Sequence, residues 1–320
     1  MLASLTPSEA LRSLEARFPG SGPDDGAVMK SASAVERTGC SIVHAGSPEF
    51  PRILDDIPDP PALLFFRGDL GRFASIPSVA VIGSRRASQY GLRAARTLAS
   101  GIAARGVGIV SGMARGIDGE AHRGCLEAGG ITIAVLGSGI DVVYPREHAS
   151  LAEEIAAHGA LVTEFPPGTL PEAFNFPRRN RLISGFSKAL VVVEAGDRSG
   201  TMITVDAALE QGRDVFAVPG EITRTGSRGT NRLLREGAMV ATCPGDILEA
   251  LGIAEEPSPG QGAQPPGGDP VTDLLARGPA HFDELSESTG MEAPALQAHL
   301  LTLELSGRIV RRPGGFYTLP

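Results

Sequence analysis

The amino-acid sequence predicts an α/β fold with a doubly wound, mainly parallel sheet. Between residues 78 and 250, short apolar runs alternate with single amphipathic stretches, a pattern typical of parallel strands buried on both faces. Several of these runs end in Gly and Ser, as loops that lead from a strand into a helix commonly do. With 320 residues, 42% of them hydrophobic, the chain is long enough for two or three domains with sizeable cores.

Residues 1–77 are expected to form a small helical accessory segment. A helix is predicted over 8–18, because Thr6, Pro7 and Ser8 make a typical helix start. The Pro-rich run at 50–70 is interpreted as a surface connector that ends in one apolar strand at 62–67.

Residues 78–252 are expected to form the main domain. Strands are predicted at 79–83, 107–111, 131–137, 160–164, 190–194 and 215–219. Helices are predicted at 90–105, 117–128, 147–158, 179–188, 200–211 and 229–236. One helix follows each strand, as the crossovers of a parallel sheet require.

The C-terminal part is expected to be a separate domain. Residues 253–269 are rich in Pro, Gly, Gln and acidic residues, which is typical of a flexible linker. Residues 270–320 contain three helical stretches, at 271–277, 282–289 and 293–305, and then a hairpin at 307–319. Three helices and a hairpin predict a winged-helix domain.

The net charge of −8 is unevenly distributed along the chain. It is −3 over residues 1–77, zero over 78–250 and −5 over 251–320. Such a balance argues against a protein that wraps duplex DNA by bulk attraction to phosphate. Within the neutral centre, however, residues 174–188 carry four basic residues and no acidic one.

Other features narrow the class of protein. The three cysteines are far apart, no CxxC pair exists, and the six histidines are scattered, so neither a disulfide framework nor a metal site is expected. The N-terminus lacks the pattern of a signal peptide, and the apolar runs are too short to span a membrane. We expect a cytoplasmic protein without metal, cofactor or membrane association.

Glycine-rich loops are predicted at the carboxyl edge of the sheet, where doubly wound folds bind ligands. Backbone N–H groups of Gly and Ser, with arginines beside them, can hold an anion. Because several such loops converge on one edge, an anion-binding crevice is favoured over glycines that only close tight turns. The residues in these loops that are expected to bind are Gly83, Ser84, Arg85, Ser111, Gly112 and Arg115.

The anion is not expected to be a nucleotide cofactor. The loop at 137–141 lacks the third glycine of a dinucleotide fingerprint, and no acidic residue follows at the required spacing. The chain contains no GxxxxGK[ST] sequence and only two lysines, Lys30 and Lys188, so a P-loop ATPase is unsupported.

The basic stretch at 174–188 indicates nucleic-acid binding. Arginine grips phosphate through paired N–H groups, and a phenylalanine face can stack on an unpaired base. The alternative is a solvated basic helix with its phenylalanines in the core. Because aromatic residues adjoin the arginines, single-stranded nucleic acid is favoured, held by Phe176, Arg178, Arg179, Asn180, Arg181 and Lys188.

Acid–base groups for catalysis are few. Asp118 and His122 lie four residues apart on one predicted helix, and Glu194 ends a predicted strand. A hydrolase can use such groups, but capping and packing are the favoured interpretation. Ser84 and Ser111 have no evident His/Asp partner nearby in the sequence, so no catalytic residue is expected.

An ordered set of motifs resembles the DNA processing protein A family (DprA/Smf). The motifs are GSR at 83–85, SGMARGIDGEAH at 111–122, TIAVLGSGIDVVYP at 132–145, FPRRNRLISG at 176–185, VVVEAGDRSGTMIT at 191–204 and VFAVPGEI at 215–222. The C-terminal unit resembles the winged-helix domain that many members carry.

The resemblance implies an extended Rossmann-like fold that binds single-stranded DNA and has no enzymatic activity. It implies a homodimer that protects incoming single strands and loads the RecA recombinase during natural transformation, with a single-strand-binding protein as a further candidate partner. By the family pattern, Arg85 and residues 179–181 bind DNA, and Phe176, Ser111 and Gly112 lie in or beside the pocket.

Two other functions are considered. A nucleotide hydrolase is suggested by residues 197–201, which resemble a glycine-rich loop of phosphoribohydrolases, but Thr204 stands where those enzymes have a catalytic glutamate. A transcription regulator is disfavoured, because the third C-terminal helix has no Lys or Arg. For that domain, protein contact or accessory DNA contact near Arg308, Arg311 and Arg312 is favoured over sequence-specific reading of duplex DNA.

Overall fold

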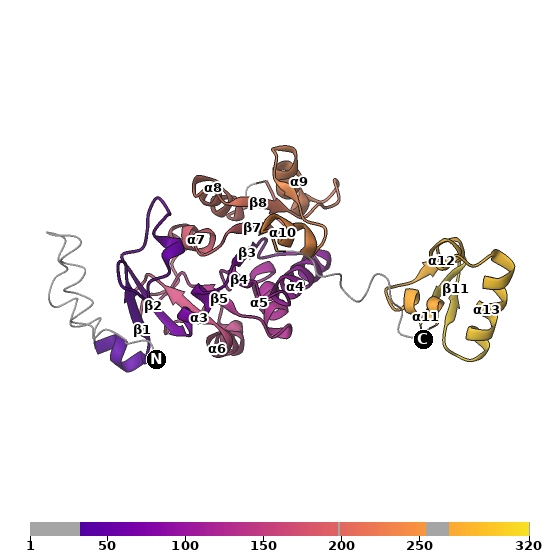
Figure 1. Ribbon diagram of the computed structural model, residues 1–320, viewed down its shortest axis with the longest axis horizontal. Helices are drawn as coiled ribbons and strands as arrows, with labels where there is room; N and C mark the ends of the chain where they lie inside the picture. The colour runs from indigo at the N-terminus through magenta and orange to yellow at the C-terminus, as the bar shows by residue number, and fades with distance from the viewer. Residues whose placement is uncertain (1–32, 198, 254–268, 320) are drawn as a thin grey trace. The chain divides into compact units, whose positions relative to one another are not determined.

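The computed structural model describes residues 33–197, 199–253 and 269–319, which fall into two compact units (Figure 1). The first unit lies within residues 1–254 and the second within 255–320. The helix expected at 8–18 and nearly all of the linker expected at 253–269 lie outside the described residues. No helix in the described parts is long and apolar enough to cross a membrane.

Nine strands form one sheet in the first unit, in the order β1-β2-β6-β5-β4-β3-β7-β8-β9. From β6 to β9 all neighbouring strands are parallel, whereas β1 and β2 are antiparallel additions at one end. The strands are β1 Ser41–His44, β2 Leu63–Gly68, β3 Ser78–Ile82, β4 Gly108–Ser111, β5 Thr132–Val135, β6 Ala160–Thr163, β7 Ala189–Val192, β8 Asp214–Ala217 and β9 Met239–Val240. The predicted doubly wound, mainly parallel sheet is therefore confirmed.

Helices cover both faces of this sheet. One face is covered by α4 Gln89–Ala103, α5 Ile117–Glu127, α6 Ala149–His158 and α10 Pro244–Ala250. The other is covered by α3 Leu70–Ala74, α7 Asn175–Gly185, α8 Thr201–Glu210 and α9 Arg228–Arg235. Within β3, Val79 and Val81 face the first layer while Ala80 and Ile82 face the second. This double burial explains why the strands appear in the sequence as continuous apolar runs.

The N-terminal part differs from the expected connector with one strand. Residues 41–44 and 63–68 form an antiparallel pair, and β2 continues into the sheet by pairing with β6. Leu64 and Phe66 are buried in the same core cluster as the parallel strands. The sequence pattern missed β1 because it is only four residues long and half-buried over its first two residues.

The chain order of the strands reverses between β3 and β7. The chain runs outward from β3 through β4 and β5 to β6, and then returns to the other side of β3 to form β7, β8 and β9. In open parallel sheets, the loops at such a reversal separate and leave a crevice at the carboxyl ends of the strands.

The second unit contains three helices and a small sheet, as expected for a winged helix. Its elements are α11 Pro270–Leu275, β10 Ala280–His281, α12 Phe282–Thr289, α13 Ala293–Leu305, β11 Val310–Arg312 and β12 Phe316–Thr318, with sheet order β10-β12-β11. Gly290 ends α12 in the left-handed conformation, at φ 67°. Leu285, Leu296, Leu300 and Tyr317 are buried in its own core.

Candidate nucleic-acid interface

A crevice of about 640 Å³ opens at the carboxyl edge of the sheet, next to the reversal between β3 and β7. Its walls come from the loops after β3, β4 and β7 and from the first turns of α7 and α8. The predicted site residues that line it are Gly83, Ser84, Arg85, Phe176, Arg179 and Asn180. The crevice therefore combines loops and a helix that are almost 100 residues apart in the sequence.

Two of the loops approach each other so closely that only glycine fits. A Cβ atom on Gly83 would lie 2.6 Å from the side chain of Ile117 and 2.9 Å from the backbone oxygen of Glu194. Gly116 has φ 74°, and a Cβ there would collide with the backbone oxygen of Ser84. The glycines thus bring the backbone of these loops together at the mouth of the crevice.

Met113 is held in an unusual backbone conformation beside these loops. Its φ is 55°, in the left-handed region that L residues other than Asn and Asp rarely adopt. Its side chain is fully buried, and its carbonyl oxygen lies 2.9 Å from Nδ1 of His148. Packing and this hydrogen bond hold the strained turn that leads from β4 toward α5.

Arg179 forms the inner wall of the crevice and is almost fully buried, with 3% of its surface exposed. Its Nη1 donates to the carbonyl oxygens of Gly112, at 3.0 Å, and of Val135. Burial lowers the pKa of Arg179 to about 10, although the nearby carboxylate of Asp118 favours the charged form. The same burial raises the pKa of Asp118, against the opposing effect of Arg179. A positive charge is therefore fixed at the base of the crevice by α7 and the ends of β4 and β5.

Arg85 and Phe176 form the outer part of the site. The Arg85 side chain is exposed, and its Cζ lies 4.9 Å from the centre of the Phe176 ring. This distance places the guanidinium in cation–π contact with the ring. Arg85 has no ion pair with any described residue, so its N–H groups remain available to a phosphate.

Tyr144 completes an aromatic surface that the sequence analysis did not assign. Its ring lies 5.7 Å from that of Phe176 at an angle of 46°, and 42% of the residue is exposed. Both rings line the crevice, and a planar base can stack on such a surface. The available signal was weak: Tyr144 is one of only three tyrosines in the chain and follows the glycine-rich loop after β5.

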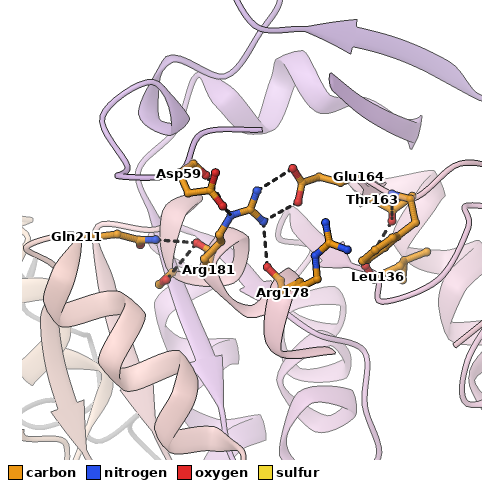
Figure 2. Close-up of polar contacts among 9 residues, drawn as sticks. Asp59, Leu136, Thr163, Glu164, Arg178, Arg181 and Gln211 are labelled. Atoms are coloured by element: carbon orange, nitrogen blue, oxygen red, sulfur yellow. Dashed lines mark hydrogen bonds and ion pairs between the residues drawn. The ribbon is translucent and has the colours of Figure 1, made fainter. Parts of the chain in front are cut away.

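The Arg181 side chain is held by ion pairs with two carboxylates of the same chain (Figure 2). Its guanidinium lies 2.5 and 2.8 Å from the two carboxylate oxygens of Glu164, and Nε lies 2.8 Å from Oδ2 of Asp59. It also donates to the carbonyl oxygen of Arg178 at 2.9 Å. Arg181 therefore fastens α7 to the end of β6 and to the loop around residue 59.

Arg178 and Asn180 are the other polar residues of α7 that were predicted to bind. Arg178 is exposed, and its Cζ lies 5.9 Å from the centre of the Phe165 ring. Asn180 is half-buried and lines the crevice. The helix begins at Asn175, four residues earlier than expected, so Phe176 and Arg179 lie one turn apart on the same face.

Ser111 and Gly112 lie behind the crevice surface. The Ser111 hydroxyl is buried and donates to the carbonyl oxygen of Val81 at 2.6 Å. A Cβ on Gly112 would lie 2.7 Å from Nη2 of Arg179 and 2.8 Å from Oδ2 of Asp118. These two residues therefore support Arg179 and Asp118 rather than line the crevice.

Of the six basic residues predicted to bind, only Arg85 and Arg179 line the crevice; Arg178 and Arg181 of α7 do not, and neither do Arg115 and Lys188. Arg115 is exposed and paired with Glu147, and this hydrogen bond lowers the pKa of Glu147 to about 2. Lys188 lies directly before β7, where its backbone N–H donates to Ser78 at the start of β3. It is therefore at the amino edge of the sheet, opposite the crevice. Linear sequence could not show this, because the basic stretch runs the full length of α7 from one edge to the other.

The three acid–base candidates, His122, Glu194 and Asp118, all form hydrogen bonds within the fold. His122 is fully buried with Nδ1 2.7 Å from the Thr132 hydroxyl, and burial lowers its pKa to about 3. Glu194 accepts hydrogen bonds from the backbone and hydroxyl of Ser88, the N-cap of α4. Asp118 accepts from the backbone of Ala114 at 3.3 Å. Across the described residues, no group of His, Cys, Asp and Glu is arranged to hold a metal ion.

Comparison with known proteins places the chain in a family. Residues 41–252 match the family model for DNA recombination-mediator protein A, and residues 255–315 match the DprA winged-helix domain. Protein Smf of Escherichia coli (strain K12) is 42% identical over 303 residues, which cover 91% of this chain and 81% of that protein. DNA processing protein DprA of Streptococcus pneumoniae (strain ATCC BAA-255 / R6) is 43% identical over 199 residues, covering 62% of this chain and 70% of that protein.

Solved structures agree with the sequence comparisons. The X-ray structure of DprA from Streptococcus pneumoniae superposes with a TM-score of 0.66 at 39% identity, covering 71% of this chain and 78% of that one. A structure of DprA from Helicobacter pylori, described as having a unique single-stranded DNA binding mode, superposes with a TM-score of 0.60 at 30% identity and covers 66% and 95%. The chain belongs to the DNA processing protein A (DprA/Smf) family.

Proposed function

We propose that this chain is a non-enzymatic protein that binds single-stranded DNA in the crevice between β3 and β7. The observation that carries the proposal is the exposed Arg85 guanidinium, without an ion pair in the described residues, placed over Phe176 at the mouth of the crevice. A guanidinium beside an aromatic ring can bind a phosphate while the ring stacks on the neighbouring base. Behind them, Arg179 adds a buried positive charge.

The wider role follows from family membership. The related protein of Helicobacter pylori binds single-stranded DNA according to its description, which supports the same ligand here. From membership of the family we infer that the chain acts in the cytoplasm as a homodimer, which protects incoming single strands and loads the RecA recombinase during natural transformation. A single-strand-binding protein is a further candidate partner.

The test is a comparison of Arg85→Ala with Arg72→Ala as a matched control. Arg72 is exposed on α3, at the amino edge of the sheet, so its loss removes the same charge away from the crevice. We expect Arg85→Ala to weaken binding of oligo-dT about tenfold or more, the order expected for a lost charge-assisted phosphate contact. Fluorescence anisotropy gives the affinity, and circular dichroism checks that both variants are folded.

Duplex of the same length is the second arm of this experiment. Oligo-dT should compete more strongly than duplex, because a flat aromatic surface can stack only on bases that are not paired. Equal affinity of Arg85→Ala and Arg72→Ala for oligo-dT, with both folded, would refute the proposed site.

A nucleotide hydrolase is the alternative function, and it needs a separate assay. Ser199 and Thr201 do line the crevice, but Thr204 lies there too, where a phosphoribohydrolase would need its glutamate. Asp118 is the single carboxylate among the described lining residues, and it is buried beside Arg179. Release of free base from nucleoside monophosphates by the wild-type protein would favour the hydrolase.

A further inference from the structure

A second hollow of about 640 Å³ lies at the carboxyl edge of the sheet, beside the crevice. It is formed by the first turns of α4 and by the loop that follows β8. Arg86 lines the crevice and Ser88 lines the hollow, so only one residue of the β3–α4 loop separates the two linings. A chain of two residues spans at most about 7 Å. One flexible ligand can therefore pass from one to the other over this loop.

The hollow contains two arginines without assigned partners. Arg93 lies on α4 and Arg224 on the loop after β8, and both are exposed. Neither side chain has a hydrogen bond or ion pair with a described residue, although most arginines around the neighbouring α4–α5 surface are paired with glutamates. The acidic residue in the lining is Glu221, so the hollow carries a net charge of +1.

The same hollow presents an aromatic side chain in a fixed position. Tyr90 is 46% exposed, and its hydroxyl donates to the carbonyl oxygen of Pro219 at 3.2 Å. Tyr90 and Arg93 are three residues apart on α4 and therefore lie on the same helix face. The hollow therefore contains an aromatic ring and two guanidiniums, the same kinds of group as Phe176 and Arg85 in the crevice.

The opposite wall of the hollow is held rigidly. The side-chain amide of Asn231 bonds both backbone groups of Gly220, accepting from N–H at 3.2 Å and donating to C=O at 2.9 Å. Gly220 lies directly against Ser227, so that a Cβ there would collide with the Ser227 hydroxyl. These contacts fix the backbone at Gly220 before a ligand arrives, which lowers the entropic cost of binding.

From this geometry we infer that the hollow is a second nucleotide subsite, which binds a later nucleotide of the same DNA strand that occupies the crevice. Arg93 and Arg224 bind the phosphate backbone, and Tyr90 stacks on a base. The inference rests on the proposed function, because it needs the crevice to hold the first part of the strand. It predicts that occupancy depends on the length of the strand.

The experiment compares a short and a long oligo-dT, of about 5 and about 20 nucleotides; the first lies near the lower end of the usual range of single-strand site sizes, about 4–16 nucleotides, and the second exceeds it. Arg93→Ala/Arg224→Ala should weaken binding of the long oligonucleotide about tenfold and leave the short one unchanged. The slope of log K against log salt should fall by about 1.4 for the long oligonucleotide, because two phosphate contacts are lost at about 0.7 each. Tyr90→Leu should weaken only the long one, about fivefold or more, whereas Tyr90→Phe retains most of the affinity.

The matched control is Arg72→Ala/Lys188→Ala. Both residues are exposed and lie at the amino edge of the sheet, Arg72 after the end of β2 and Lys188 directly before β7, so the control removes the same charge at the opposite edge of the sheet. If Arg93→Ala/Arg224→Ala and the control variant bind the long oligonucleotide with equal affinity, the proposed subsite does not exist. An equal loss for short and long oligonucleotides also overturns it, since the hollow would then be part of the first site.

Failure of the underlying function gives a different result. If the wild-type protein binds neither oligonucleotide, the proposed binding of single-stranded DNA in the crevice is refuted. The comparison of the two lengths then has no affinity to compare. Thermal unfolding followed by circular dichroism shows whether each variant is folded before its affinity is read.

Discussion

Arg179 shows how one side chain can serve both the fold and a binding site. It lines the crevice, yet its Nη1 is the hydrogen-bond donor to two buried carbonyl oxygens, of Gly112 and Val135. A buried carbonyl without a donor costs about 1–3 kcal/mol. Arg179→Met should therefore lower the free energy of unfolding by about 2–4 kcal/mol, measured by urea denaturation.

The neighbouring Arg178 is a suitable control for this prediction. It has the same charge on the same helix but is exposed, so Arg178→Met should change the free energy of unfolding by no more than about 0.5 kcal/mol. Adding Asp118→Asn to Arg179→Met should recover part of the loss, because the buried carboxylate then needs no positive neighbour. Similar stability of the two arginine variants would show that the buried bonds of Arg179 contribute little.

His122 makes the stability of the first unit depend on pH. Burial lowers its pKa in the folded protein to about 3, below the unfolded value of about 6.5. Between these values the unfolded chain binds more protons, so stability falls as the pH falls from about 6.5 toward 3. At pH 5 the loss from this residue is about 2 kcal/mol. His122→Gln should therefore show a smaller drop in melting temperature between pH 7 and pH 5 than the wild type, and an identical drop would contradict this account.

At the scale of elements, α7 is the part of the site whose position depends most on distant residues. Arg181 joins it to Glu164 at the end of β6 and to Asp59 before β2, and Gln211 after α8 donates to the Arg181 carbonyl (Figure 2). The Arg181 and Glu164 side chains are only 19% and 22% exposed, so the pair is less screened than a surface pair.

A double-mutant cycle can separate this role from DNA contact. We expect Arg181→Met and Glu164→Gln to be coupled by about 1 kcal/mol in the free energy of unfolding, because the bidentate pair is partly buried. If Arg181 acts on DNA only by holding α7, the two single variants should weaken oligo-dT binding to a similar extent. A loss of affinity in Arg181→Met that greatly exceeds the loss in Glu164→Gln would instead indicate direct contact with DNA.

At the scale of the whole molecule, we expect the two units to contribute unequally to DNA binding, because they differ in net charge. All residues of the crevice and of the second hollow lie in the first unit. Residues 254–320 carry a net charge of −5, and α13 has no Lys or Arg. A chain that ends at residue 253 should therefore bind oligo-dT within about threefold of the full chain, since a unit of this charge contributes little phosphate attraction. Anisotropy titrations of the two proteins at equal salt would check this, and a loss of tenfold would assign DNA contact to the second unit.

The sequence by itself determined the parallel sheet, the winged-helix unit and the edge of the sheet at which the crevice lies. These features depend on local periodicity and on glycines at strand ends, and both can be read along the chain. It also predicted Arg85, Phe176, Arg179 and Asn180, which the structure brings to one crevice. Family membership, confirmed by comparison, rests on the same local motifs.

Only the tertiary structure decided which basic residues share that crevice. Lys188 lies at the opposite edge because α7 carries the chain across the sheet, and Arg115 and Arg181 are paired with glutamates that are far away in the sequence. Tyr144 and the hollow around Arg93 and Arg224 arise from loops that meet only in three dimensions. Local patterns report which groups are present, but long-range packing decides which charges remain free to bind a ligand.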